Sequence, residues 1–241
     1  MTDYREEIPI KVEEELCKKK REEEKLLCRK GITQEGFQAA VKEKMARGKV
    51  SFILAVYQTF DEFLKKEIEK TGIVPVCKKG CSYCCYQMIT CTEMEIDEVI
   101  NFIKGSEKET RRRLIWQAEK GIKKWKKYFG RNATILERNP FQVLEDWQGK
   151  PCVFLDERDG SCNIYPVRIM DCRTSTSLTP CGSGIECHFF CELDWSGPGR
   201  LRFQCENWAN NMIVEEQKKK FEYMAVSPIL HWLSLREREL E

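Results

Sequence analysis

The stretch Cys77-Lys78-Lys79-Gly80-Cys81-Ser82-Tyr83-Cys84-Cys85 places four thiols within nine residues of the chain. Thiolates are soft ligands, and cysteines at this density usually indicate a bound metal. Seven more cysteines lie between residues 152 and 205: Cys152, Cys162, Cys172, Cys181, Cys187, Cys191 and Cys205. A metal site is therefore the feature around which we expect this chain to fold.

The composition indicates a globular protein without a strongly charged partner. The chain has 241 residues, of which 41% are hydrophobic, enough for one large domain or two small ones with a real core. Its 41 basic and 39 acidic residues leave a net charge of +2, so the charges are mixed rather than polarised. Nothing in this balance demands nucleic acid or a membrane, and we expect neither as a partner.

The cysteine count is best explained in a reducing compartment. Residues 1–7 carry acidic side chains where a signal peptide would have a basic start, and no window approaches the roughly 18 apolar residues of a membrane helix. We therefore expect a soluble, cytoplasmic protein, whose 14 cysteines indicate metal or redox sites. The alternative, a disulfide scaffold, is typical of chains under ~80 residues that lack long helices.

Hydrophobic periodicity predicts a mainly α fold with little β structure. Helices are expected over residues 11–30, 33–47, 51–70, 106–129, 206–225 and 227–240. Another helix should begin at Thr92, because Glu95 three residues later completes a capping box. We divide the chain into an N-terminal helical region (1–72), a cysteine-cluster domain (73–205) and C-terminal helices that pack on the core (206–241).

The segment 149–199 is predicted to be loop-like, because glycine and proline recur along it and interrupt any long element. A structureless loop of that length is unusual in a compact domain unless something other than side-chain packing holds it. Cysteines concentrate in this same segment, so metal ligation is the expected constraint. The fold class is thus a helical domain with long Cys/Gly/Pro-rich loops organised around one or more metal sites.

The helix expected over 106–129 combines an apolar side with a basic side. Lysines and arginines cover the second side: Arg111, Arg112, Arg113, Lys123, Lys124, Lys126 and Lys127. A solvated face is the first interpretation of this pattern, and contact with an anionic partner is the second.

The first three thiols, Cys77, Cys81 and Cys84, have the spacing Cys-x3-Cys-x2-Cys. This spacing resembles that of radical S-adenosylmethionine enzymes, in which three thiolates hold a [4Fe-4S] cluster and one iron binds the cofactor. Those enzymes use a partial (β/α) barrel, whereas the chain after Cys84 shows helices and loops without alternating strands, and it has no Gly-Gly-Glu run. A radical enzyme that uses these three cysteines is kept as an alternative.

The adjacent pair Cys84 and Cys85 bears on the kind of metal site. If this segment is extended, neighbouring side chains point to opposite sides and do not easily reach one small ion. Two metal centres, or one larger cluster, would accommodate the pair. A single zinc closed by four local cysteines is the simpler alternative, but it leaves Cys152, Cys162 and Cys172 unexplained.

Two downstream segments extend the pattern: Pro151-Cys152-Val153-Phe154-Leu155 and Cys162-Asn163-Ile164-Tyr165-Pro166-Val167-Arg168-Ile169-Met170-Asp171-Cys172-Arg173. Together with Cys77–Cys85 and Thr92-x-x-Glu95 they resemble the YkgJ-like cysteine-cluster family, whose members are described as zinc- or iron-chelating. The family pattern is Cys-x3-Cys-x2-Cys-Cys, Thr-x-x-Glu, Pro-Cys-x-x-Leu and Cys-x-Ile-Tyr-x-x-Arg-Pro-x-x-Cys-Arg. This chain departs from it at Ile169, where the family usually has proline, and at Val153, where a second proline is common.

The resemblance implies a composite site with seven family-type ligands: Cys77, Cys81, Cys84, Cys85, Cys152, Cys162 and Cys172. An eighth donor would come from the downstream group, where Cys181 and Cys187 stand ahead of the two later cysteines only because they are nearer in sequence. His188 lies in the same group and could be a ligand or a hydrogen-bonded structural residue. Cys91 lies outside the pattern, and we expect it to be a packing thiol.

Three further residues are expected to support the cofactor from outside the ligand set: Arg168, Arg173 and Tyr165. Guanidinium groups beside an anionic thiolate cluster can offset its charge and donate hydrogen bonds to sulfur. Tyr165 could do likewise or simply pack. We predict such supporting roles for all three and identify no catalytic residue.

Two hypotheses about function stay open. In the first, an iron-sulfur cluster or zinc is redox-active or catalytic, and the protein modifies a peptide or protein partner; the resemblance extends distantly to flagellin lysine N-methylases. In the second, thiolates close every metal position of a structural zinc protein, and the helices serve as an interaction module. A catalytic triad, a phosphate loop, a dinucleotide fingerprint and a His-Glu-x-x-His helix are absent from the sequence. Spacing does not separate zinc from iron, because both accept four thiolates.

Overall fold

The computed structural model describes residues 31–48, 50–71, 80–129, 147, 149–175, 203–221 and 226–240. Helices dominate this part of the chain: α2 (Gln34–Gly48), α3 (Phe52–Thr71), α4 (Glu93–Gly105), α5 (Lys108–Phe129), α7 (Met170–Thr174), α9 (Gln204–Phe221) and α10 (Ile229–Leu235). The mainly α fold class is confirmed, and the helices predicted at 33–47, 51–70 and 106–129 are present. The helix predicted at 11–30 lies outside the described residues. No described helix is long and apolar enough to cross a membrane.

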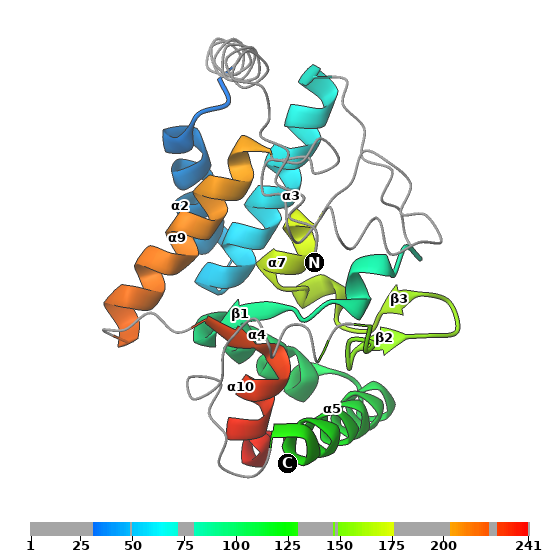
Figure 1. The fold of residues 1–241 in the computed structure, drawn as a ribbon. Helices are drawn as coiled ribbons and strands as arrows, with labels where there is room; N and C mark the ends of the chain where they lie inside the picture. Colours follow the sequence, from blue (N-terminus) through cyan, green and yellow to red (C-terminus); the bar gives the residue numbers. More distant parts are fainter. Residues whose placement is uncertain are drawn as a thin grey trace, which may run out of the picture.

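Two hydrophobic clusters organise these helices. The first is formed mainly by α2, α3 and α9, with Phe37 and Phe60 fully buried in it. The second is formed mainly by α4, α5 and α10, with Ile100 and Leu233 at its centre. Figure 1 shows the first group in the upper left and the second group below, with α7 and strand β1 (Thr90–Thr92) between them.

The N-terminus of α4 is fixed by the predicted capping box, which is confirmed. The Glu95 amide donates to the Thr92 hydroxyl oxygen at 3.4 Å, and the Thr92 amide donates to the Glu95 carboxylate at 2.9 Å. Reciprocal bonds of this kind satisfy two amide donors that a helix start otherwise leaves unpaired. The start of α4 is therefore held rigidly, a few residues after the first group of cysteines.

The C-terminal segment returns to the centre of the fold through a short sheet. β1 pairs antiparallel with β4 (Val226–Pro228), and Cys91 lies opposite Ser227. The Trp232 indole donates to the Cys91 carbonyl at 2.9 Å, which fixes α10 against the same strand. The prediction of helix from residue 227 is corrected here, because the chain first completes this strand pair and turns helical at Ile229.

Gly121 lets α5 approach both α10 and the loop that carries Cys152. A Cβ atom at this position would lie 2.7 Å from Leu230 Cδ2 and 2.7 Å from Val153 Cγ2, closer than real Cβ atoms come to other carbons. Glycine in a helix interior usually costs stability, but at this position a side chain would collide with Leu230 and Val153. The loop of Cys152 is thereby packed directly on the second helix group.

The segment after Gly149 is more ordered than a plain loop. Residues 149–175 contain strand β2 (Leu155–Asp156), strand β3 (Ser161–Cys162), the 3-10 helix η3 (Tyr165–Val167) and α7. The expectation that no long element occurs here is correct for the described residues, but short elements are present, and each positions a residue of the cysteine pattern. Another 3-10 helix, η4 (Glu237–Glu239), follows α10.

Candidate metal centre

The thiols of Cys84 and Cys85 lie on a 3-10 helix, η1 (Tyr83–Tyr86), and not on an extended segment. The Cys85 amide donates to the Ser82 carbonyl at 2.9 Å. With three residues per turn, neighbouring side chains differ in direction by ~120° rather than ~180°, and the Cys85 thiol lies close enough to Cys84 to raise its pKa. The expected extended conformation is wrong, so the adjacent pair no longer argues for two separate metal centres.

A backbone connection joins the two cysteine segments of the pattern. The Cys152 amide donates to the Cys85 carbonyl at 2.6 Å, and the Gly149 amide donates to the Tyr86 carbonyl at 2.9 Å. η1 and the segment that begins at Gly149 therefore run side by side, although a long stretch of chain separates them. This arrangement brings the Cys152 thiol within electrostatic range of the Cys84 thiol.

The β2–β3 hairpin meets the first cysteine segment at two glycines. Gly80 and Gly160 have φ angles of +87° and +71°, a region that glycine adopts without strain. A Cβ atom at Gly160 would lie 2.4 Å from the Gly80 carbonyl oxygen, a distance that no side chain can accommodate. Only glycine fits this contact, which fixes the hairpin tip against the residue before Cys81.

The same hairpin presents Cys152 and Cys162 together. β2 and β3 pair antiparallel, with Leu155 opposite Cys162. The Leu155 amide donates to the Cys152 carbonyl at 3.0 Å, and the Asn163 amide donates to the Phe154 carbonyl at 2.8 Å. Two of the predicted ligands are thus carried by one short backbone unit.

The buried carboxylate of Glu95 positions α7, which carries Cys172. Glu95 Oε1 accepts from the Met170 amide at 2.8 Å and from the Tyr57 hydroxyl at 2.9 Å. Glu95 Oε2 accepts from the Thr92 amide at 2.9 Å. Burial raises the pKa of Glu95, and hydrogen bonds from the Thr92 and Met170 amides oppose the rise. One side chain thereby connects α3, α4 and the start of α7.

A second carboxylate holds α7 from the other side. Asp171 Oδ2 accepts from the Thr90 amide at 3.1 Å and from the Thr90 hydroxyl at 3.3 Å. Asp171 precedes Cys172 directly, so strand β1 fixes the backbone next to this thiol.

The described thiols influence one another electrostatically. The pKa of Cys84 is raised, first by its hydrogen bond with Cys85 and then by burial. Burial raises the pKa of Cys152 to about 12, and the neighbouring Cys162 and Cys84 contribute to the rise. Burial also raises the pKa of Cys172, with smaller contributions from Cys152 and Cys84. These couplings indicate that Cys84, Cys152, Cys162 and Cys172 lie near one another. Ionising several of these thiols at once is unfavourable unless a cation balances their charge.

Arg168 is the cation that acts on most of these thiols, and Arg173 also acts on Cys162. Burial raises the pKa of Cys162, and the positive charge of Arg168 opposes the rise, as it does at Cys84 and Cys172. The Arg168 Nε atom is buried and has no hydrogen-bond acceptor among the described residues. Buried N–H groups nearly always find a partner, so an acceptor that carries negative charge, such as thiolate or cluster sulfur, would complete its surroundings.

The other two predicted supporting residues lie differently. Tyr165 is 57% exposed, and the Arg168 guanidinium lies 4.9 Å from the centre of its ring. Arg173 is buried and donates to the Arg168 carbonyl at 2.6 Å and to Asp61 on α3 at 2.6 Å. Arg173 therefore connects α3 with the segment between Cys162 and Cys172. Whether either residue contacts the cofactor stays a prediction.

The remaining predicted ligands divide into two groups. Cys81 is described and exposed, whereas Cys77, Cys181 and Cys187 lie outside the described residues, as do Cys191 and His188. None of the described cysteines forms a disulfide. No three His, Cys, Asp or Glu side chains of the described ranges converge closely enough to hold a metal ion as they stand.

Two further cysteines lie in the hydrophobic core. Cys91 is 2% exposed in the second cluster, and Cys205 is fully buried in the first. Burial raises the pKa of Cys205, and the adjacent Glu67 adds to the rise. Cys205 lies in the first turn of α9. Its amide donates to the Glu67 carboxylate at 2.9 Å, which attaches the start of α9 to α3.

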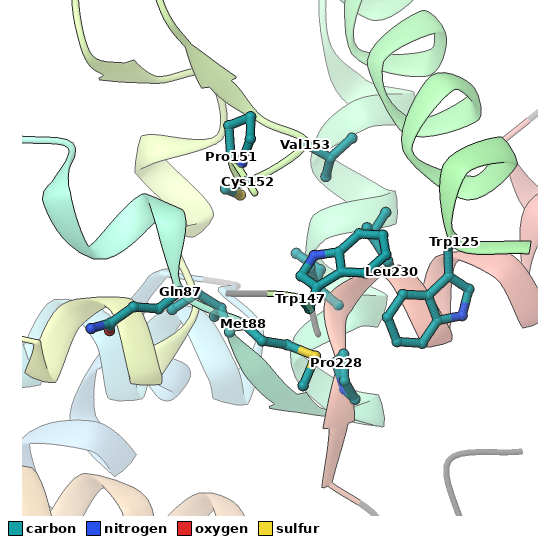
Figure 2. A pocket seen from close by; sticks show the side chains of 11 residues that line it. Gln87, Met88, Trp125, Trp147, Pro151, Cys152, Val153, Pro228 and Leu230 are labelled. Atoms are coloured by element: carbon teal, nitrogen blue, oxygen red, sulfur yellow. The ribbon is translucent and has the colours of Figure 1, made fainter. Parts of the chain in front are cut away.

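A small apolar pocket lies beside Cys152. Figure 2 shows Pro151, Cys152 and Val153 on one side of it, with Trp147 and Trp125 opposite. Met88 and Leu230 contribute further apolar surface. The loop of Cys152 is therefore bordered by aromatic packing, which limits the access of water to this side of the thiol.

Sequence reasoning found the ligand candidates but missed the residues that position them. The Thr92-x-x-Glu95 spacing predicted a helix cap, whereas the second carboxylate oxygen of Glu95 reaches Tyr57 and Met170, which are distant in sequence. The contact of Gly80 with Gly160 was missed as well. The sequence does show glycines close to the candidate cysteine ligands. Their positions in the sequence do not show which two glycines contact each other in the fold.

A comparison with protein-family models matches residues 76–194 to the model CxxCxxCC, whose description is "Putative zinc- or iron-chelating domain". The match covers the η1 thiols, the β2–β3 hairpin and α7, and the predicted family resemblance is confirmed over this range. The comparisons with curated proteins and with solved structures gave no match.

Proposed function

Residues 76–194 of this chain belong to the CxxCxxCC family of zinc- or iron-chelating domains, and on this basis we propose that the protein binds zinc or an iron-sulfur cluster through a polythiolate centre. The predicted ligands are Cys77, Cys81, Cys84, Cys85, Cys152, Cys162 and Cys172, with a further donor from Cys181 or Cys187. Because metal binding requires reduced thiols, the proposal includes a cytoplasmic location.

One observation carries this proposal: the buried Nε–H of Arg168 has no acceptor among the described residues and lies amid thiols from separate segments. A neutral set of thiols gives the Arg168 guanidinium no counter-charge, and its buried Nε–H no acceptor. Metal-bound thiolates would supply both the negative charge and the acceptors. The donor set therefore fits a thiolate-bound metal.

The chemistry expected of the bound metal depends on its identity. Zinc bound by four thiolates is a closed structural site, whereas an iron-sulfur cluster exchanges electrons. The residues of the chain would have the same tasks in both cases: η1 and the hairpin present thiols, α7 presents Cys172, and Arg168 offsets charge. Redox or peptide-modifying activity remains a hypothesis. For the radical-enzyme alternative, the described strands offer no support, since they form only two short antiparallel pairs.

The experiment is anaerobic purification followed by metal analysis and an absorption spectrum. Brown protein with broad absorption near ~400 nm and several irons per chain would establish an iron-sulfur cluster. Colourless protein with stoichiometric zinc would establish the zinc form. A chain that retains neither metal, even after reconstitution under reducing conditions, would refute the proposal.

A further inference from the structure

Helix α5 carries a charge that the composition of the whole chain conceals. Nine of its residues are basic and two are acidic, which gives a formal charge of +7, compared with +2 for the entire chain. The rest of the sequence is therefore net acidic, at −5. The chain as a whole is balanced, but the charges are segregated.

The cations of α5 gather around an exposed tryptophan. At ~100° per residue, five of them fall within ~60° of Trp116 on the helix surface, and they define what we name the Trp116 face: Arg112, Arg113, Trp116, Lys120, Lys123 and Lys127. All five cations are exposed, and Trp116 is 59% exposed. The Lys120 ammonium lies 4.9 Å from the centre of the Trp116 ring.

These five cations have no ion-pair partner within the described ranges of the chain. Lys126, on the flank of the same helix, differs in this respect, because it pairs with Glu237. Glu109 and Glu119 also lie near Trp116 by the same helical geometry, but no ion pair joins them to the face among the described residues. The Trp116 face is thus a basic surface with an aromatic centre.

The Trp116 face borders the candidate metal centre. Gln117, the neighbour of Trp116, accepts a hydrogen bond from the Asn163 side chain at 3.3 Å. The pKa of Asp156 on β2 is lowered to about 2, chiefly by Arg158, and Arg113 contributes through its charge. Figure 1 shows α5 at the margin of the fold, below the β2–β3 hairpin. A molecule bound on this face would therefore lie next to the hairpin that carries Cys162.

We propose that the Trp116 face is a docking surface for an acidic segment of a partner polypeptide. Arginine and tryptophan are enriched at protein interfaces, where a buried aromatic anchor contributes affinity and surrounding charges contribute specificity and association rate. A nucleic-acid partner is less well matched, because such domains are strongly basic overall and this chain has a net charge of only +2. The proposal goes beyond metal binding and does not depend on it.

The test measures binding of a fluorescein-labelled peptide in which glutamates are interspersed with two leucines, by fluorescence anisotropy with the full-length protein. The variants are Trp116→Ala and the charge reversal Lys120→Glu/Lys123→Glu. The matched control is Lys218→Glu/Lys219→Glu, which reverses two exposed lysines on α9. Metal-loaded and metal-free protein are both measured, so that failure of docking is separated from failure of metal binding.

We expect the reversal on α5 to weaken binding about tenfold or more, and the control reversal to change it less than about twofold. Raising the salt concentration should weaken wild-type binding, because exposed charges are screened, whereas Trp116→Ala should weaken it about fivefold at every salt concentration. Equal effects of both reversals, or no effect of Trp116→Ala, would overturn the proposal. So would tighter binding of single-stranded DNA or anionic vesicles than of the peptide, or self-association that the α5 reversal abolishes.

Discussion

The Cys152 amide donates a hydrogen bond to the Cys85 carbonyl at 2.6 Å, so two distant parts of the cysteine pattern are joined through their backbones. This bond needs neither thiol. The described part of the centre is consequently positioned by the protein itself, through this contact, the Gly80–Gly160 contact and the carboxylate of Glu95. The proposed metal would then bind to thiols whose segments are already joined by these contacts.

Replacing Cys85 by serine should lower the metal content of anaerobically purified protein. The substitution removes the thiol of a predicted ligand, which also acts on the Cys84 thiol, but it keeps the backbone contact with Cys152. Metal per chain, measured by elemental analysis, is the readout. Cys91→Ser is the control, because Cys91 lies in the core outside the predicted ligand set. Equal metal content in the two variants would show that Cys85 is not a ligand.

Replacing Gly160 by alanine should destabilise the protein more than the same change at Gly149. Both glycines have positive φ, +71° and +75°, which costs alanine ~1–2 kcal/mol. Only at Gly160 would the new Cβ collide with the Gly80 carbonyl oxygen, at 2.4 Å, whereas nothing lies within 4 Å of a Cβ at Gly149. We expect a further loss of ~1–3 kcal/mol at Gly160 from this collision.

Urea unfolding of both variants measures the difference, and metal content should fall only in Gly160→Ala. Similar unfolding free energies for the two variants would mean that the hairpin tip does not rest on Gly80.

Replacing Glu95 by glutamine should cost ~2–4 kcal/mol of unfolding free energy, because one carboxylate oxygen becomes an amide donor that faces other donors. The native carboxylate accepts from Thr92, Tyr57 and Met170. Tyr57→Phe removes only one of these donors and should cost ~1 kcal/mol. Chemical unfolding measures both values. If the glutamine variant is no less stable than the phenylalanine variant, Glu95 does not organise this region.

The metal-free protein should lose stability as the pH rises above about 9. Burial raises the pKa of Cys152 in the folded state from 9.0 to about 12. Between these values the unfolded chain releases the proton and the folded chain keeps it, so unfolding becomes more favourable with rising pH. Metal-loaded protein should lack this dependence, since its ligands are already deprotonated. Thermal unfolding from pH 8 to 11 tests this, and a flat profile for the metal-free protein would contradict it.

Replacing Arg168 by glutamine should weaken zinc affinity ~10-fold and move the midpoint of metal uptake to higher pH. The change removes the charge that favours the thiolate forms of Cys84, Cys162 and Cys172. Competition with a chromophoric chelator across a pH series provides both numbers. Arg158→Gln is the matched control, because Arg158 is exposed on the hairpin and pairs with Asp156. Identical uptake curves for the two variants would exclude the role assigned to Arg168.

The helices could be predicted from sequence because their signals are local. The apolar stripe of α3 recurs every three to four residues, and the Thr92–Glu95 box of α4 spans four residues. The pairing of β1 with β4 could not be predicted, since each strand has three residues and the partners lie at distant points of the chain. Strands this short carry no usable alternation.

The candidate ligands could be identified from sequence, because the type and spacing of the cysteines match the family pattern. The backbone conformation of the cysteine segments could not be predicted in this way. The adjacent cysteines were expected to be extended, and they lie on a 3-10 turn whose amide bonds reach Ser82 and Cys84. The basic side of α5 was also readable from sequence, because its lysines and arginines are close together in the chain. Exposure and pairing were not readable: Trp116 is 59% exposed, and Lys126 pairs with Glu237 from a distant part of the chain.

Helix α3 forms hydrogen bonds with the chain just before and just after residues 176–202. Before them, Arg173 donates to Asp61, and after them, the Gln204 and Cys205 amides donate to Glu67. Asp61 and Glu67 are six residues apart, or ~9 Å along the helix. Contacts within the protein therefore hold the two described ends that flank residues 176–202 on the same helix. A ligand from Cys181 or Cys187, as proposed above, would belong to a stretch of chain whose two described ends both bind α3.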